Sequence, residues 1–410
     1  MKRGSVRKPA CRWVKLPGAM LVLTLAAGCG KVPTWGELTG QQPATPPTIT
    51  PVVIQPAPVQ TPVTPVQPPK PNAAEVIARF KALPPSQIGD QALAELASLT
   101  EGLEEFTELN VANGPVSDSG LASLAKLPLL KKLELSNTKV GDQGMQNLAQ
   151  ISTLESLSIN GTKISDAGVA NLTALPNLKI LDLRSCQLTP EGFAAIGKMP
   201  TLEEIILDST PGINDTTFDL ICNARTLKRL HMNYVRGISD NGMRSLAKLE
   251  ILEELHVNEC PITGESLTQV AKTGLKNLKK LAINTCPITL AGAKAINLCK
   301  SLEHLNVGGL SMDDKGLVIL TQGLTNLKVL HLNGCKNVTG SGFTAFKAAT
   351  NLELLTLQNT GVVDQAMPLL KGFKKLKKLD MLETRVSGNA VRDLKKSLPD
   401  CEILCRDGTF

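Results

Sequence analysis

The sequence predicts an α/β solenoid, a stack of strand-plus-helix units that curves with a parallel sheet on its concave face and short helices on its convex face. Two observations predict this class. A unit of 24 to 26 residues recurs twelve times in the 410-residue chain. Within each unit, the apolar residues also change from alternating positions, typical of a strand, to the spacing of a helix. The units begin at Phe106, Leu130, Leu154, Leu178, Leu202, Leu227, Leu252, Leu278, Leu302, Leu327, Leu352 and Leu376.

One unit, Leu154–Asn177, shows both halves in the letters LESLSINGTKISDAGVANLTALPN. Its L-x-x-L-x-L start predicts a short strand whose apolar positions point inward while the residues between them face solvent. Its second half predicts a short helix, with Ser165 as the N-cap, Asp166 in the first turn and Pro176 after the end. Such a unit cannot bury its apolar face alone, so stability comes from stacking on its neighbours.

The turn after each strand carries the most specific signature. In nine of the twelve units its ninth position is Thr or Cys, and an Ile/Val-[Ser/Thr]-Asp-x-Gly pattern follows it in many of them. This pattern resembles the cysteine-containing subtype of leucine-rich repeats, known from F-box-type repeat proteins and from many bacterial envelope proteins. The resemblance implies a leucine-rich-repeat solenoid that serves as a scaffold for partners without specifying which. No helical F-box precedes the repeats, so a ubiquitin-related role is not implied. The nine positions are Thr138, Thr162, Cys186, Thr210, Cys260, Cys286, Cys335, Thr360 and Thr384.

The first 28 residues have the layout of an export signal. Six lysines and arginines without an acidic residue are followed by an apolar run from Ala19 to Ala27, which is too short to span a bilayer. The end of this run and the two residues after it, Leu25–Cys29, resemble a bacterial lipoprotein box. The resemblance implies a lipid on Cys29 and an exported, lipid-anchored envelope protein. An ordinary cleaved signal is the alternative. Because the leader holds six of the seven net positive charges, the basic balance does not indicate nucleic-acid binding.

Composition divides the rest of the chain into four parts. Residues 29–72 contain the candidate lipidated cysteine and a proline-rich segment that predicts an extended spacer. Residues 73–105 predict a helical N-terminal cap, and residues 106–393 hold the twelve repeats. Residues 394–410 predict a C-terminal cap that covers the other end of the core.

The cysteines predict structure more than chemistry. Those at the turn position, Cys186, Cys260, Cys286 and Cys335, are expected to be small buried side chains under the strand ends. Cys401 and Cys405 would lie about 13 Å apart in a strand, so they form a disulfide only if the cap bends there, and both outcomes stay open.

No familiar catalytic or metal-binding spacing is present: the sequence has no C-x2-C pair, H-E-x-x-H, P-loop or G-x-S-x-G. We therefore predict that the protein is not an enzyme and has no cofactor.

The solvent-facing strand positions provide the candidate site. All four histidines and the one tyrosine of the chain occupy them. His231 and His256 take the fifth position of adjacent units, and neighbouring strands lie about 4.8 Å apart, so the two rings are expected side by side. Exposed strand positions must also be polar for solubility, which is the simpler explanation of the same residues. The candidate ligand-binding surface consists of Asp208, Arg229, His231, Asn233, Tyr234, Glu254, His256, Asn258, Glu259, Asn284, His304, Asn306, His331 and Asn333.

The leading functional hypothesis is a non-enzymatic recognition module that presents this surface to a protein, or alternatively to a polysaccharide, in the cell envelope. A structural protein that assembles with itself or with the wall is a second hypothesis. A metal or catalytic site on His231 and His256, with Asp208 and Glu254 nearby, is a third. It is the least favoured because two histidines in one column lack a third and fourth ligand in an obvious arrangement.

Overall fold

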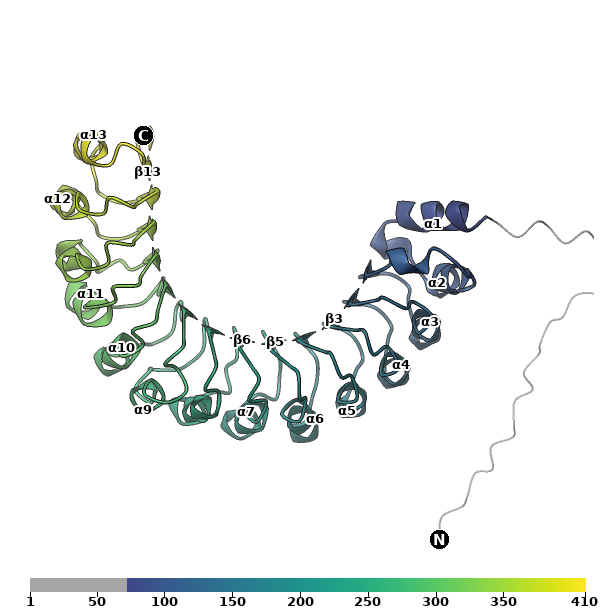
Figure 1. Ribbon diagram of the computed structural model, residues 1–410. Helices are drawn as coiled ribbons and strands as arrows, with labels where there is room; N and C mark the ends of the chain where they lie inside the picture. The colour runs from purple at the N-terminus through teal and green to yellow at the C-terminus, as the bar shows by residue number, and fades with distance from the viewer. Residues whose placement is uncertain (1–71) are drawn as a thin grey trace, which may run out of the picture. The chain divides into compact units, whose positions relative to one another are not determined.

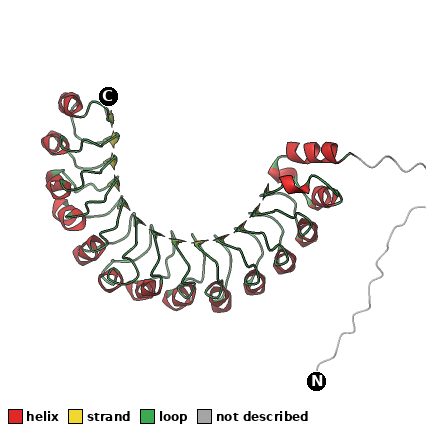
Figure 2. Cartoon of the chain, viewed as in Figure 1, coloured by secondary structure: helices red, strands yellow, loops and turns green. Residues whose placement is uncertain are grey.

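The computed structural model describes residues 72–410, so the leader, Cys29 and the proline-rich segment lie outside the described residues. Residues 72–410 belong to one compact unit. In this unit a 14-stranded sheet lines the inside of an arc and the helices follow the outside (Figure 1; Figure 2). The predicted fold, a curved leucine-rich-repeat solenoid, is confirmed. Among residues 72–410, no helix combines the length and apolar character that crossing a membrane requires.

The strands follow chain order across the sheet, and neighbouring pairs from β1 to β13 are parallel. Only β14 runs antiparallel, against the outer edge of β13. The strands are β1 (Glu108–Asn110), β2 (Lys132–Glu134), β3 (Ser156–Ser158), β4 (Ile180–Asp182), β5 (Glu204–Ile206), β6 (Arg229–His231), β7 (Glu254–His256), β8 (Lys280–Ala282), β9 (His304–Asn306), β10 (Val329–His331), β11 (Leu354–Thr356), β12 (Lys378–Asp380), β13 (Glu402–Cys405) and β14 (Gly408–Thr409).

The helices on the convex side are short. The α-helices are α1 (Ala73–Ala82), α2 (Asp90–Ala97), α3 (Asp118–Leu124), α4 (Asp142–Leu148), α5 (Asp166–Leu172), α6 (Pro190–Ile196), α7 (Asp215–Ile221), α8 (Asp240–Met243), α9 (Leu267–Val270), α10 (Leu290–Asn297), α11 (Asp314–Thr321), α12 (Met367–Leu370) and α13 (Gly388–Ser397). The 3-10 helices are η2 (Pro85–Gln87), η3 (Leu103–Glu105), η4 (Arg244–Lys248), η5 (Ser341–Phe346) and η6 (Asp364–Ala366).

Equivalent residues of successive units face each other across the sheet. Leu230 of β6 pairs with Leu255 of β7, and both side chains are fully buried. The same register places His231 opposite His256 on the solvent side. One apolar core therefore runs through all the units, while the concave surface carries columns of equivalent residues.

A left-handed residue turns the chain after each strand. The eighth residue of every unit has φ between 54° and 75°, a conformation that favours glycine. Nine of these positions hold a residue other than glycine, including Tyr234, Glu259 and Thr285. The sharp turn sends the chain from the concave sheet toward the convex helices.

Aspartates at the helix starts link neighbouring units. Asp142 accepts hydrogen bonds from the backbone N–H of Ser165 at 2.8 Å and of Gly168 at 3.0 Å in the next unit. We expected such aspartates to act on their own helix dipole, but their hydrogen bonds join helix to helix. Where Leu290 replaces the aspartate, Asp313 of the next unit caps its own helix instead, through the N–H of Gly316 at 2.9 Å.

The four turn cysteines are buried, as predicted. Each thiol donates to a backbone carbonyl of the preceding unit, for example Cys286 Sγ to Val257 O at 3.1 Å. Burial raises the pKa of the Cys286 thiol to about 11, so it stays protonated at neutral pH. Cys401 and Cys405 are both buried free thiols, and no disulfide joins them.

Candidate functional site

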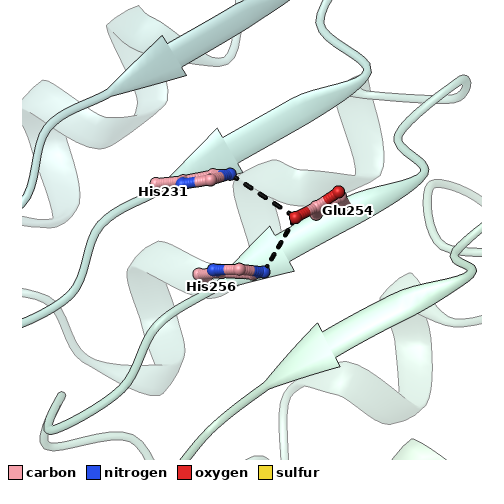
Figure 3. A group of neighbouring side chains, drawn as sticks. All are labelled: His231, Glu254 and His256. Carbon is pink, nitrogen blue, oxygen red and sulfur yellow. Dashed lines mark ion pairs between the residues drawn. The ribbon is translucent and has the colours of Figure 1, made fainter. Parts of the chain in front are cut away.

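The candidate surface contains the stacked pair His231 and His256. Strands β6 and β7 hold the two rings in a parallel stack, with centroids 4.3 Å apart and planes 17° apart. Glu254 lies two residues before His256 on the same face of β7. Its Oε1 is 3.0 Å from Nε2 of His256 and 3.7 Å from Nε2 of His231 (Figure 3). The adjacency expected from the repeat register is therefore present, with a carboxylate facing both rings.

Glu254 is mostly withdrawn from solvent, with its side chain 13% exposed. Burial alone would raise its pKa, but the Lys280 ammonium, 3.0 Å from Oε2, and the neighbouring histidines outweigh burial and lower it. Burial and the charge of His231 lower the pKa of His256. The site therefore combines an ionised carboxylate with a neutral His256 at physiological pH.

The asparagines of the seventh position form a ladder. Asp208 Oδ1 accepts from the backbone N–H of Asn233 at 2.8 Å, and Asn233 Oδ1 accepts from that of Asn258 at 3.0 Å. Asn258 Oδ1 accepts from the backbone N–H of Asn284 at 2.8 Å. Three of these predicted ligand-binding residues, Asp208, Asn233 and Asn258, use their side chains to satisfy backbone groups at the strand ends.

The ladder stops at Asn284. Its Oδ1 is buried and has no hydrogen-bond partner among the described residues. The next unit has Gly308 at the seventh position, and its backbone N–H donates instead to Asn306 Oδ1, at 3.3 Å. Asn333 resumes the pattern by accepting from the N–H of Gln358 at 2.9 Å.

Two hollows lie on the concave face beside this interruption. The first, about 250 Å³, is bordered by Glu254, His256, Lys280, Ala282, His304 and His331. The second, about 610 Å³, is bordered by Asn284, Asn306, Gly308, His331, Asn333 and Gln358. Both are lined by Asn306 and His331, so they form one polar depression from β7 to the turn after β12.

Besides His256, the depression is lined by His304 and His331, which are both partly buried. Burial and the charge of Lys280 lower the pKa of His304. Burial and the charge of His304 lower the pKa of His331, whose Nδ1 lies 2.9 Å from the hydroxyl of Thr356. Both imidazoles are therefore neutral at physiological pH and can donate through one nitrogen and accept through the other.

The remaining candidate residues lie outside the depression. Arg229 is held by Glu204, with Nε 2.6 Å from Oε2. Tyr234 and Glu259 occupy left-handed turn positions, and Tyr234 is 53% exposed. The fourteen predicted residues are thus divided among the histidine cluster, the asparagine ladder, the depression and exposed turns.

Sequence reasoning missed several residues that shape the depression. Lys280 anchors Glu254, while Gly308, Gly309 and Gly334 leave the second hollow open. A signal was available, because glycine interrupts the seventh column after seven consecutive polar residues. The prediction rested on polar side chains, whereas a missing side chain opens space.

Comparisons with known proteins agree with the repeat architecture. The family model described as a leucine-rich repeat matches residues 126–149, 150–172 and 174–197. F-box/LRR-repeat protein 23 of Arabidopsis thaliana is 31% identical over 135 residues, which is 31% of this chain and 30% of that protein. The chain therefore matches under a third of the length of this curated relative.

The chain is also similar to solved structures at low sequence identity. An internalin from Listeria monocytogenes superposes with a TM-score of 0.51 at 20% identity, over 82% of this chain and 94% of that one. A leucine-rich-repeat protein of Leptospira interrogans superposes with a TM-score of 0.46 at 16% identity, over 80% of this chain and 97% of that one. The chain has a leucine-rich-repeat solenoid fold, and its residues 126–197 contain three matches to the leucine-rich-repeat family model.

Proposed function

We propose that this chain is a non-enzymatic recognition protein that binds a protein partner in the polar depression of its concave face. The observation that carries the proposal is the pair of hollows that share Asn306 and His331. Leucine-rich-repeat solenoids are typically binding scaffolds, because stacking provides an extended concave surface. A polysaccharide is the alternative ligand, since the lining offers amide and imidazole groups that also bind hydroxyls.

The depression has unused hydrogen-bonding capacity at its border. Buried acceptors without a partner are rare in folded proteins, and each is unfavourable by about 1–3 kcal/mol. Asn284 Oδ1 is such an acceptor, at the border of the larger hollow. A partner that donates a hydrogen bond there after a small side-chain movement would remove this penalty on binding.

The decisive variant is Gly308→Asn, which places the ladder residue in the gap. The new side chain would project into the larger hollow, and its amide N–H would lie close to Asn284 Oδ1. A Cβ at this position lies 3.0 Å from the carbonyl oxygen of Asn333, so the adjoining strand end must shift slightly. The measurement is capture of partners from envelope extract by the immobilised full chain, with a thermal melt to verify folding.

We expect Gly308→Asn and His331→Ala to lose the captured partner while the protein stays folded. Lys315→Ala, at an exposed position of α11 on the convex side, is the matched control and should keep it. Treating the extract with protease or with glycosidases separates a protein partner from a polysaccharide. Full capture by a folded Gly308→Asn variant would show that the depression is not the binding site.

The proposal includes export and attachment to the envelope through a lipid on Cys29. Its support is the leader sequence and the LAAGC segment that ends at this cysteine. Replacing Cys29 with Ser should abolish labelling with a radioactive fatty acid and release the protein from membranes. Undiminished labelling of the variant would contradict the lipid attachment.

A further inference from the structure

We propose that His231, Glu254 and His256 bind a divalent transition-metal ion, with zinc as the first candidate. The repeat sequence argued against a metal because two histidines in one column had no evident third ligand. The structure provides one, since Oε1 of Glu254 faces the Nε2 atoms of both rings (Figure 3). This inference does not depend on the proposed partner of the concave face.

The donor set suits zinc. Two imidazole nitrogens and one carboxylate oxygen are the protein ligands of zinc sites that keep an open coordination position. Hard cations such as Ca²⁺ and Mg²⁺ prefer sites made of oxygen ligands, which disfavours them here. The open positions would face the solvent of the concave side and could hold water.

The distances are close to those of a formed site. One ligand atom from each of the three residues lies within 4.8 Å of the others. Tetrahedral ligands at 2.0–2.2 Å from zinc are about 3.3–3.6 Å apart, so the measured 3.0 and 3.7 Å bracket that separation. The two rings are stacked 4.3 Å apart, so they must turn out of the stack for both nitrogens to point at one ion.

A second observation also supports a metal ion bound at this cluster. Nε2 of His231 is buried and has no hydrogen-bond partner among the described residues. The stacked ring of His256 holds this nitrogen toward Glu254, although 3.7 Å is too long for a hydrogen bond. A metal ion between Nε2 and Oε1 would satisfy both atoms.

The surrounding residues already orient the carboxylate. Lys280 Nζ lies 3.0 Å from Oε2 of Glu254, which leaves Oε1 free to face the histidines. Such outer contacts fix a ligand's orientation, and their loss typically weakens metal affinity about 10- to 100-fold. Lys280 also places a positive charge near the ion. This charge lowers the affinity for the metal, while the contact positions the Glu254 carboxylate.

The test is calorimetric titration of the chelator-treated full chain with Zn²⁺, accompanied by elemental analysis and by the visible spectrum of the Co²⁺-loaded protein. We expect one ion per chain and a cobalt spectrum typical of four-coordinate nitrogen and oxygen ligands. His231→Gln, Glu254→Gln and His256→Gln should each weaken zinc binding by about 100-fold or more, beyond the effect of an outer contact. Lys280→Met removes the contact between Lys280 and Glu254 and tests its effect on zinc binding.

The matched controls are His304→Gln and His331→Gln, which remove concave histidines outside the cluster and should leave zinc binding unchanged. Thermal melts of the metal-free variants separate loss of the site from loss of the fold. Absence of stoichiometric zinc in the folded wild-type chain would overturn the proposal. Equal zinc binding by a folded variant that carries all three substitutions, His231→Gln, Glu254→Gln and His256→Gln, would also overturn it, as would a thiolate-type cobalt spectrum.

Discussion

Asn233 accepts two hydrogen bonds from Asn258 through its side-chain carbonyl oxygen, at 3.0 Å from the backbone N–H and 2.7 Å from the side-chain amide. Asn258 in turn accepts from the backbone N–H of Asn284 at 2.8 Å. One side chain therefore connects three successive units at the ends of their strands. In a solenoid whose stability depends on contacts between neighbours, such a residue acts as an interface contact.

Replacing Asn258 with Ala should lower the free energy of unfolding by about 1–3 kcal/mol, because it leaves the N–H of Asn284 without a partner and removes one of the two hydrogen bonds to Asn233 Oδ1. Urea denaturation measures the change. Asn258→Asp is the control, since it keeps an acceptor for Asn284 and Asp208 already provides an acid in this column. An alanine variant as stable as the wild type would mean that water replaces the ladder at no cost.

Thr285→Gly should stabilise the protein. A β-branched residue at φ 58° is disfavoured by about 1–2 kcal/mol, whereas glycine loses about 0.5–1 kcal/mol through its freedom in the unfolded chain. The net gain is roughly 0.5–1 kcal/mol, measurable as a higher urea midpoint. Gly161 and Gly334 already hold the equivalent position in other units. The reverse change, Gly334→Thr, is the control and should destabilise.

The fold was predictable because the same repeat pattern occurs twelve times in the sequence. A period-two segment, a turn and a helical segment in fixed order leave few ways to stack, and the register followed from aligning the units. The adjacency of His231 and His256 came from the same alignment, because equivalent positions of parallel strands face each other.

The role of the asparagine column was not predictable in the same way. A polar residue at an exposed strand position bonds either a ligand or its own backbone, and sequence does not distinguish the two. Asn233 lies next to the backbone N–H of Asn258 in the following unit, and its side chain bonds this group. The aspartates at the helix starts show the same limit. The helix-dipole argument considered a single unit, whereas Asp142 accepts a hydrogen bond from Ser165 in the next unit.

Asp314→Asn should destabilise the C-terminal half of the solenoid. The carboxylate accepts from the backbone N–H of Thr339 at 2.9 Å and of Gly342 at 2.8 Å, and an amide would turn a donor toward one of these groups. We expect a loss of about 1.5–3 kcal/mol at neutral pH in urea denaturation, the range for hydrogen bonds to a charged group.

The same variant should change the acid limb of the stability curve. Burial would raise the pKa of Asp314, but hydrogen bonds from Thr339 and Gly342 outweigh it and lower the pKa below its ordinary 3.8. Its stabilisation is thus present above pH 3.8 and lost as the pH falls through the folded value. Asp314→Asn should remove that part of the slope, whereas the exposed Asp400→Asn should not. An unchanged acid limb would contradict the assignment.

His331→Gln should reduce the loss of stability in mild acid. Burial and the positive charge of His304 lower the pKa of His331 below its ordinary 6.5. The unfolded chain therefore binds a proton that the folded chain resists, and stability declines as the pH falls from 6.5 toward the folded pKa. Glutamine does not titrate, yet its amide can still bond the hydroxyl of Thr356, which lies 2.9 Å from Nδ1 in the wild type. Urea midpoints between pH 7.5 and 5 should converge or cross for wild type and variant, whereas Lys315→Ala should run parallel to the wild type. If His331→Gln also runs parallel, His331 is protonated as readily in the folded chain as in the unfolded one.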